Sequence, residues 1–197
     1  MEYLLETILI KNNRVYNIKY HNERFNRSRR MLFGNNKKIN LRKLIDTSKA
    51  IFPITKCRIT YNNEISNIEY IAYNYPKISS LMLINNDAIE YKYKYQNRTN
   101  LKKIFDKKGR AHDIVIVKND KLTDTYFANI ALLKNGKWYT PMSPLLEGTR
   151  RAKLIEKKKI IPKDIAIDSI DEYASIVIFN AMIPFGKINI TMDNLIK

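Results

Sequence analysis

The sequence contains little cysteine, glycine or proline, and it has no long apolar run. Its 197 residues include one cysteine, so no internal disulfide can form and no cluster of thiolates can hold a metal. With 5 glycines and 6 prolines, collagen-like and low-complexity structures are excluded. No segment reaches the ~18 apolar residues of a membrane helix. The first residues carry Glu2 and Glu6 within an apolar run and lack a basic leader, so we expect a cytoplasmic protein without membrane contact.

Acidic residues are also few, and this raises the question of a nucleic-acid partner. The 36 Lys and Arg exceed the 19 acids and give a formal charge of +17. A charge of this size can indicate nucleic-acid binding. The basic residues are spread along the whole chain, and no helix-turn-helix, zinc-finger or RNA-binding signature accompanies them. We therefore interpret the excess as solvated surface charge and do not expect nucleic-acid binding.

The order of apolar patterns predicts a two-domain α/β protein. Up to residue 73 the sequence predicts two hairpins, with helices over residues 21–33 and 41–51, as an α+β unit. Residues 74–80 are the best linker. Beyond them we expect helices over 99–107 and 148–157, and strands over 81–84, 89–95, 113–117, 123–133, 138–140 and 175–180. The expected domains are a small α+β domain over residues 1–78 and a larger mixed α/β domain over 79–197.

Several common catalytic motifs are missing. The sequence has no Gly-rich phosphate loop and no Gly-x-Ser-x-Gly elbow. His21 and His112 lie far apart, without metal-ligand spacing or an adjacent nucleophile. We therefore expect ordinary surface or turn histidines and no metal site.

An ordered set of polar residues remains. Alone, each member has a simple explanation, since Lys94 alternates with tyrosines like an exposed strand lysine and Asp124 could be a turn acid. The set begins with Lys94-Tyr-Gln-Asn97-Arg98 and continues with Asp124, Asn129-Ile130, Thr140, Gly148-Thr149-Arg150-Arg151 and Asn180-Ala181. In this order and spacing the residues resemble the class IV pyridoxal-phosphate aminotransferases, whose signature runs acid, Asn, apolar residue, Thr and Gly-x-x-Arg.

The resemblance extends over most of the chain. The Lys-x-x-Asn-Arg motif is most similar to the aminodeoxychorismate lyase branch of the family. Near the N-terminus, Glu6-Thr7 resembles the family's Phe-Glu-Thr strand, and His21-Asn-Glu-Arg24 resembles its His-x-x-Arg. One departure is that Asp124 stands where the family usually has the longer Glu.

The resemblance implies a fold, a cofactor and a role for each residue. The fold would be type IV, with pyridoxal 5'-phosphate in a cleft between two domains, usually in a homodimer. Lys94 would form the Schiff base and remove the substrate's Cα proton. Asp124 would keep the pyridine nitrogen protonated. The phosphate would be bound by Arg24, by main-chain donors at Thr149 and Arg150, and by the side chain of Asn180.

The resemblance also implies a reaction on a small amino substrate. The favoured reaction converts 4-amino-4-deoxychorismate to 4-aminobenzoate and pyruvate, a step of folate biosynthesis. Transamination of a D- or branched-chain amino acid is the alternative, because both reactions begin with the same proton removal by Lys94. A third alternative is a catalytically inactive basic binding protein on the same fold. The charge of +17 supports it, and the presence of Lys94, Arg24 and Asp124 argues against it.

Overall fold

The chain forms two compact units, each with its own sheet. The computed structural model describes residues 2–197. Unit 1 comprises Met1–Tyr75 and Tyr93–Asn97, and unit 2 comprises Pro76–Lys92 and Arg98–Lys197. The change after residue 75 lies close to the expected division at residue 78. The segment 93–97, which contains Lys94, groups with unit 1, whereas the sequence analysis placed it in the larger domain.

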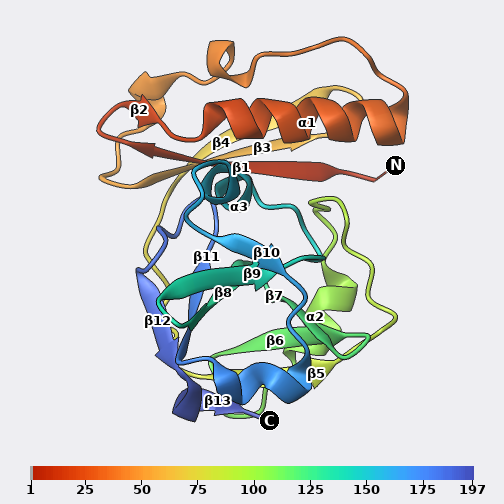
Figure 1. Ribbon diagram of the computed structural model, residues 1–197. Helices are drawn as coiled ribbons and strands as arrows, with labels where there is room; N and C mark the ends of the chain where they lie inside the picture. Colours follow the sequence, from red (N-terminus) through yellow and green to blue (C-terminus); the bar gives the residue numbers. More distant parts are fainter. Residues whose placement is uncertain (1) are drawn as a thin grey trace. The chain divides into compact units, whose positions relative to one another are not determined.

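Unit 1 is an antiparallel sheet covered on one face by a helix (Figure 1). The sheet has the order β2-β1-β3-β4. Its strands are β1 (Leu4–Lys11), β2 (Arg14–Val15), β3 (Thr55–Tyr61) and β4 (Ile65–Ala72). Along β1, Leu4, Ile8 and Ile10 are buried and pack with Phe25 of helix α1 (Ile18–Phe33). Period-two burial on the strand therefore builds this core, to which α1 contributes Phe25.

The expected helix over residues 41–51 is wrong. Two short 3₁₀ turns stand in its place, η1 (Leu41–Lys43) and η2 (Thr47–Lys49). The Asn40 side chain accepts a hydrogen bond from the Arg42 N–H, and the Asp46 side chain accepts one from the Ser48 N–H. Side chains that bond the backbone locally compete with helix formation, so each cap starts a single turn that the next one interrupts.

The segment 93–97 lies antiparallel beside the start of β1. Leu5 N–H donates to the Lys94 carbonyl over 2.8 Å, and Gln96 N–H donates to the Tyr3 carbonyl over 2.8 Å. Leu4 pairs with Tyr95 between these bonds. The expected strand over 89–95 is therefore wrong in extent, because only this short bridge forms. Since β3 occupies the other edge of β1, Lys94 lies on the edge that β2 also uses.

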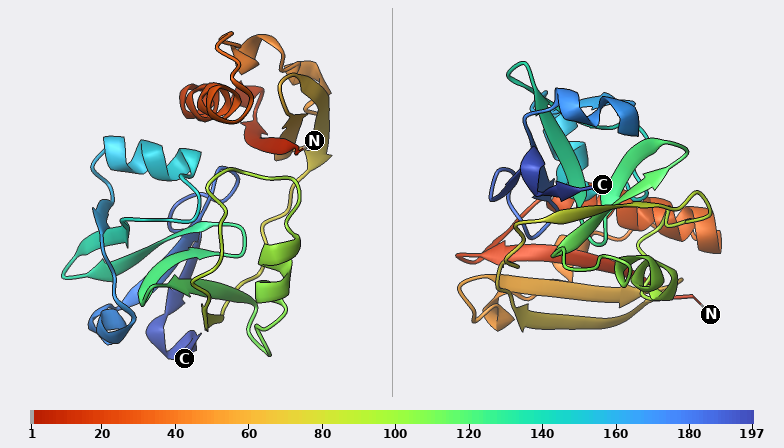
Figure 2. Two further views of the ribbon diagram at one scale, coloured as in Figure 1. Left: turned by 90° about the vertical axis from the view of Figure 1, so that its right-hand side faces the viewer. Right: turned by 90° about the horizontal axis from the view of Figure 1, so that it is seen from below.

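Unit 2 is a mixed sheet of nine strands with two helices (Figure 2). Seven strands follow the order β10-β9-β8-β7-β6-β5-β13, and β11 pairs with both β8 and β12. Strands β6 and β11 are buried along almost their whole length and form the centre of the core. The helices are α2 (Thr99–Phe105) and α3 (Thr149–Glu156). The strands are β5 (Leu81–Asn85), β6 (Asp113–Lys118), β7 (Lys121–Thr125), β8 (Asn129–Lys134), β9 (Lys137–Pro141), β10 (Ile161–Lys163), β11 (Ser175–Phe179), β12 (Ile188–Thr191) and β13 (Leu195–Ile196), and two 3₁₀ turns, η3 (Ile167–Glu172) and η4 (Met192–Asn194), complete the unit.

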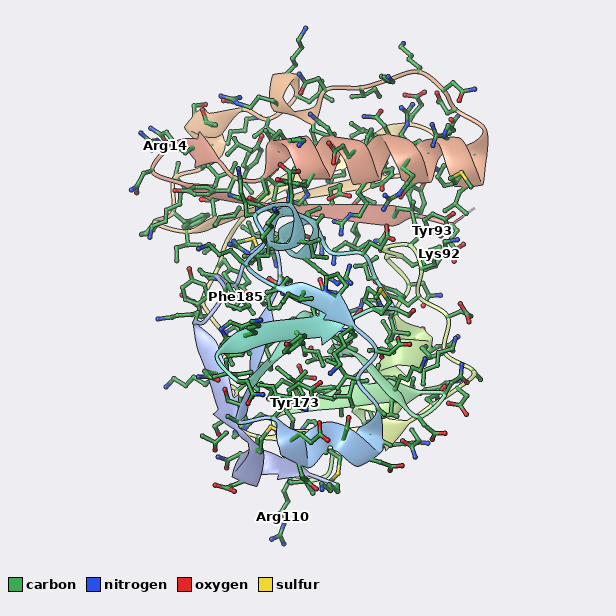
Figure 3. All side chains as sticks on the ribbon, viewed as in Figure 1. Arg14, Lys92, Tyr93, Arg110, Tyr173 and Phe185 are labelled. Carbon is green, nitrogen blue, oxygen red and sulfur yellow. The ribbon has the colours of Figure 1, made fainter. Side chains whose placement is uncertain are left out.

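The outer surface carries much of the positive charge. Arg14 at the β1–β2 hairpin and Arg110 in unit 2 are exposed, and their side chains extend away from the ribbon (Figure 3). Within residues 2–197, no helix combines the length and the apolar character that a membrane crossing requires.

Candidate active site

A buried charged network lies inside unit 1. Glu6 occupies a core-facing position of β1 between Leu4 and Ile8, and its side chain is 0% exposed. Arg24 donates from Nε to Oε1 over 2.8 Å and from Nη2 to Oε2 over 2.7 Å. His21 Nδ1 lies 2.5 Å from the same Oε2. His21 and Arg24 are three residues apart on α1, so both face the strand and converge on one carboxylate.

The network fixes the charge of its members. Burial alone would raise the pKa of Glu6, but the Arg24 charge and the hydrogen bonds from His21 and Arg24 outweigh it and lower the pKa to about 2. The pKa of His21 is lowered, chiefly by burial, although its bond to Glu6 acts in the opposite direction. The carboxylate can only accept, so Nδ1 of the neutral imidazole carries the hydrogen. The charges of Arg24 and Lys94 also lower the His21 pKa, so Lys94 belongs to the electrostatic surroundings of this network.

The two histidines differ from each other. His21 is fully buried, so the expectation of a surface or turn histidine is wrong for this residue. The alternation of β1 and the three-residue spacing on α1 contained the relevant signal, but the pairing joins distant parts of the chain. His112 is exposed and lies 3.1 Å from the Ser80 hydroxyl, as expected of a turn histidine.

In unit 2, a buried carboxyl is held at both oxygens. Asp124 on β7 is 5% exposed. Its Oδ1 accepts from Asn129 Nδ2 over 2.8 Å, and its Oδ2 accepts from the Leu146 N–H over 2.9 Å. Burial raises the pKa of Asp124 to about 6, although the bonds from Leu146 and Asn129 and the charge of Arg151 lower it in part. The carboxyl is therefore held in one orientation, and burial makes its charged form less favourable than in water.

The signature residues Asn129 and Gly148 depend on each other. Asn129 Nδ2 also donates to the Leu146 carbonyl over 2.9 Å, so one amide joins β8, Asp124 and the segment before α3. A Cβ atom at Gly148 would lie 1.9 Å from Asn129 Oδ1. Gly148 has φ −69°, which any residue adopts, so the close approach alone requires glycine.

The start of α3 is tied to the turn after β11. Arg150 donates from Nε to the Asn180 carbonyl over 2.5 Å and from Nη2 to the Ala181 carbonyl over 3.0 Å. Asn180 Oδ1 accepts from the N–H groups of Met182 and Ile183 over 2.8 and 2.9 Å. Thr149, which precedes Arg150 and is the first residue of α3, is buried. The Asn180 side chain therefore organises a turn, a role that the sequence did not predict.

Two further signature residues act as structural ties. Arg151 is buried and donates from Nη2 to the Pro141 carbonyl over 2.8 Å. Thr140 donates to the Ile130 carbonyl over 2.8 Å and accepts from Arg151 Nε over 3.4 Å. These contacts link α3, β9 and β8, and so hold the elements on which Asp124 and Thr149 depend.

The predicted site residues thus form two groups, one in each unit. Arg24 and Lys94 lie with Glu6 and His21 in unit 1. Asp124, Thr149, Arg150 and Asn180 lie in unit 2. The sequence did not predict that Glu6 would pair with Arg24 and His21. Among residues 2–197, no group of three or more His, Cys, Asp and Glu could hold a metal ion.

Comparison with known proteins identifies the family. The family described as amino-transferase class IV matches residues 3–189. An uncharacterized protein of Haemophilus influenzae is 36% identical over 182 residues, which cover 91% of this chain and 97% of that protein. The structure of a putative 4-amino-4-deoxychorismate lyase from Haemophilus somnus has 33% identity and a TM-score of 0.87, and the match covers 93% of this chain and 97% of that one.

More distant structures share the fold alone. A fold IV transaminase from Curtobacterium pusillum has 14% identity and a TM-score of 0.75, over 96% of this chain and 76% of that one. The prediction of a mixed α/β fold of type IV is confirmed by these matches. The chain belongs to the class IV aminotransferase family and is a fold type IV enzyme of the pyridoxal-phosphate-dependent class.

Proposed function

We propose that this enzyme binds pyridoxal 5'-phosphate and converts 4-amino-4-deoxychorismate to 4-aminobenzoate and pyruvate. The observation that carries the proposal is the similarity, over nearly the full length of both chains, to the Haemophilus somnus protein described as a putative lyase of this substrate. The segment Lys94-Tyr-Gln-Asn97-Arg98 supports the same branch of the family.

The donor chemistry of the chain fits this cofactor. A phosphate dianion requires cationic and N–H donors. Arg24 in unit 1 would supply positive charge, and in unit 2 the backbone of Thr149 and Arg150 at the start of α3 and the amide of Asn180 would supply N–H groups. A pyridine nitrogen that stays protonated requires a carboxylate fixed beside it. Asp124 is a fixed group of this kind, since both of its oxygens accept hydrogen bonds. When bound, the cofactor supplies an aldehyde that reacts with amines and a ring that accepts electrons.

In this proposal, Lys94 carries the covalent and proton-transfer chemistry. Its Nζ would hold the cofactor through the aldehyde carbon until the substrate amine displaces it. The freed Lys94 amine would then take the proton from the substrate carbon that bears the amine. Loss of that proton would let the substrate ring become aromatic as the ring–oxygen bond to the enolpyruvyl group breaks, and the released enolpyruvate would take up a proton to give pyruvate. Asp124 keeps the ring nitrogen protonated, because a carboxylate beside that nitrogen favours its charged form.

Trapping tests the assignment of Lys94. The purified protein should be yellow, and borohydride should fix the cofactor on the peptide that contains Lys94. Lys94→Ala should abolish the adduct and the activity together. Lys92→Ala is the matched control, because Lys92 is exposed two residues earlier and should leave both unchanged. An adduct on Lys92 or another lysine would overturn the assignment.

Product analysis tests the reaction. Incubation with 4-amino-4-deoxychorismate should release 4-aminobenzoate and pyruvate in equal amounts. A panel of D- and branched-chain amino acids with 2-oxoglutarate should yield little glutamate. Efficient glutamate formation without 4-aminobenzoate would support the transaminase alternative, and the absence of both adduct and products would support the inactive binding protein. We further propose a homodimer, which light scattering on the purified protein measures.

A further inference from the structure

The turn between β7 and β8 is weakly fixed by strand pairing. The two strands share one paired position, Asp124 with Asn129. The turn is closed by the Thr125 N–H, which donates to the Ala128 carbonyl over 2.9 Å. Thr125 Oγ1 also accepts from the Ala128 N–H over 3.1 Å. Outside the turn, Thr125 pairs with Val115 of β6, and Asn180 Nδ2 donates to the Phe127 carbonyl over 3.3 Å. The turn begins one residue after Asp124, and the backbone of Tyr126 makes two further contacts that bear on the position of the acid.

Arg98 contacts this turn at Tyr126, through a hydrogen bond and a ring contact. Its Nη2 donates to the Tyr126 carbonyl. Its guanidinium carbon lies 4.2 Å from the centre of the Tyr126 ring and 5.9 Å from that of Tyr91. Phe105 of α2 also packs against Tyr126, with 4.4 Å between the two ring centres. A planar guanidinium can bond a carbonyl and stack on an aromatic ring at the same time, which lysine cannot do equally well.

Asp113 contacts the same residue, Tyr126, at its backbone N–H. The residue starts β6 and is fully buried. Its Oδ1 accepts from the Tyr126 N–H over 3.3 Å and from the Ile114 N–H over 2.8 Å. Burial raises the pKa of Asp113 to about 6, and the nearby charge of Arg98 is among the effects that lower it in part. A buried acid costs more than an apolar residue of similar size, so its presence calls for a reason.

We propose that Arg98 and Asp113 are positioning residues that act through Asp124. Together they hold the N–H and the carbonyl of Tyr126, and so fix the turn from which Asp124 and Asn129 extend. We call the contacts of Arg98 and Asp113 with Tyr126 the clamp. The inference rests on the proposed function, because the clamp is proposed to position Asp124, the acid that would act on the cofactor ring. Arg98 belongs to the Lys-x-x-Asn-Arg motif, and this role explains why an arginine ends that motif here.

Hydrogen exchange on the cofactor-free protein tests the clamp by itself. Arg98→Met should speed exchange of the amides of residues 126–128 by roughly tenfold, since local opening requires the loss of fewer contacts. The buried amides of β6 should exchange as in the parent protein. Lys102→Met is the matched control on α2, because Lys102 is exposed and pairs with Asp106. Unchanged exchange at 126–128 would overturn the clamp, and Arg98→Lys gives the same test with the charge retained.

A double-mutant cycle tests the action through Asp124. With saturating cofactor and a single turnover, Arg98→Met should slow product formation by roughly tenfold to a hundredfold, but by less than about twofold in the Asp124→Asn background, because coupled residues are not additive. Asp113→Leu should behave like Arg98→Met, whereas Asp113→Asn keeps an acceptor for the Tyr126 N–H and should recover most of the rate. Effects that multiply would overturn the positioning role.

The two experiments separate this inference from the proposed function. If the parent protein binds no pyridoxal phosphate and forms no product, the proposed function fails and the role through Asp124 fails with it. The exchange experiment still reports whether Arg98 holds the turn. If the parent protein is active and the cycle is additive, only the positioning role fails.

Discussion

Glu6 and Arg24 form a two-point ion pair within the core that β1 and α1 share, with N–O distances of 2.8 and 2.7 Å. Apolar residues flank Glu6 on its strand, and the carboxylate has no exposed surface. An apolar pair would fill such a position at lower cost. The pair instead holds the Arg24 guanidinium by its Nε–Nη2 edge, so the fold fixes the orientation of this side chain.

The first prediction concerns the stability that depends on this pair. Glu6→Gln should lower the free energy of unfolding by about 3 kcal/mol, because removal of one partner leaves a buried charge uncompensated. Urea unfolding of the full chain measures the change. Glu69→Gln is the matched control, since Glu69 pairs with Arg58 in the same sheet with side chains 33% and 39% exposed. That variant should lose less than about 1 kcal/mol, and equal losses would contradict the prediction.

The second prediction concerns acid. The pKa of Glu6 is about 2 in the folded chain, against an ordinary value of 4.5. A depressed pKa means that the stabilisation is present above the ordinary value and is lost as the pH falls toward the folded one. The urea midpoint should therefore drop between about pH 4.5 and pH 2. Glu6→Gln should show a smaller drop over this range, and an identical pH profile would argue against the shift.

The third prediction separates phosphate binding from general binding. Arg24→Lys keeps a positive charge but loses the planar fork that contacts Glu6. The affinity of the cofactor-free protein for pyridoxal phosphate should fall by about tenfold, as expected when one charge-assisted contact is lost. The affinity for pyridoxal, which has no phosphate, should stay unchanged. Calorimetric titration with both compounds measures this difference, and equal losses would assign Arg24 a purely structural role.

The fourth prediction concerns the chemical role of Asp124. Asp124→Asn should still bind the cofactor, but proton removal from the substrate should slow by a factor of several hundred, which corresponds to about 3–4 kcal/mol of lost transition-state stabilisation. Asp124→Glu should keep substantial activity, because the family usually has this acid. Single-turnover rates measure both. A rate for Asp124→Asn equal to that of the parent protein would mean that the acid only stabilises the turn.

The fifth prediction uses the close approach of Gly148 and Asn129. Gly148→Ala should lower the free energy of unfolding by about 1–3 kcal/mol, because the new methyl group must displace the Asn129 amide. Asn129→Ala removes the amide with which the new methyl group clashes. Gly148→Ala should therefore cost less stability in the Asn129→Ala variant than in the parent protein. Urea unfolding of the three variants measures the coupling. Additive losses would show that the backbone relaxes without involving Asn129.

Local pattern was sufficient for much of the fold. Alternation predicted strands near residues 56–61 and 64–73, and the structure has them at 55–61 and 65–72. The absence of Gly and Pro predicted a helix over 21–33, and the observed helix begins three residues earlier, at Ile18. The helix over 41–51 failed because Asn40 and Asp46 bond the backbone locally, which an apolar pattern does not reveal. The strand expected over 123–133 is split by the turn at 126–128, which Arg98 and Asp113 hold from distant positions in the sequence.

The candidate site shows the same division. The sequence pointed to Lys94, Asp124 and the start of α3, because the order and spacing of these positions resemble the family signature. The partners of Arg24 and Asn180 could not be predicted, since each contact joins elements whose approach depends on the complete fold. The sequence showed no relation between Asn129 and Gly148. In the structure the Asn129 side chain occupies the space that a Cβ atom at position 148 would need, so it explains the glycine.

The return of residues 93–97 to unit 1 has a consequence for dissection of this protein. A gene fragment that ends at residue 78 encodes the strands and helix of unit 1 but omits the stretch that covers the start of β1. Such a fragment would expose the Leu5 N–H and the Tyr3 carbonyl at an open sheet edge, and open edges recruit other chains. Residues 1–78 expressed alone should therefore self-associate, and a synthetic peptide of residues 93–97 supplied in excess should compete for that edge.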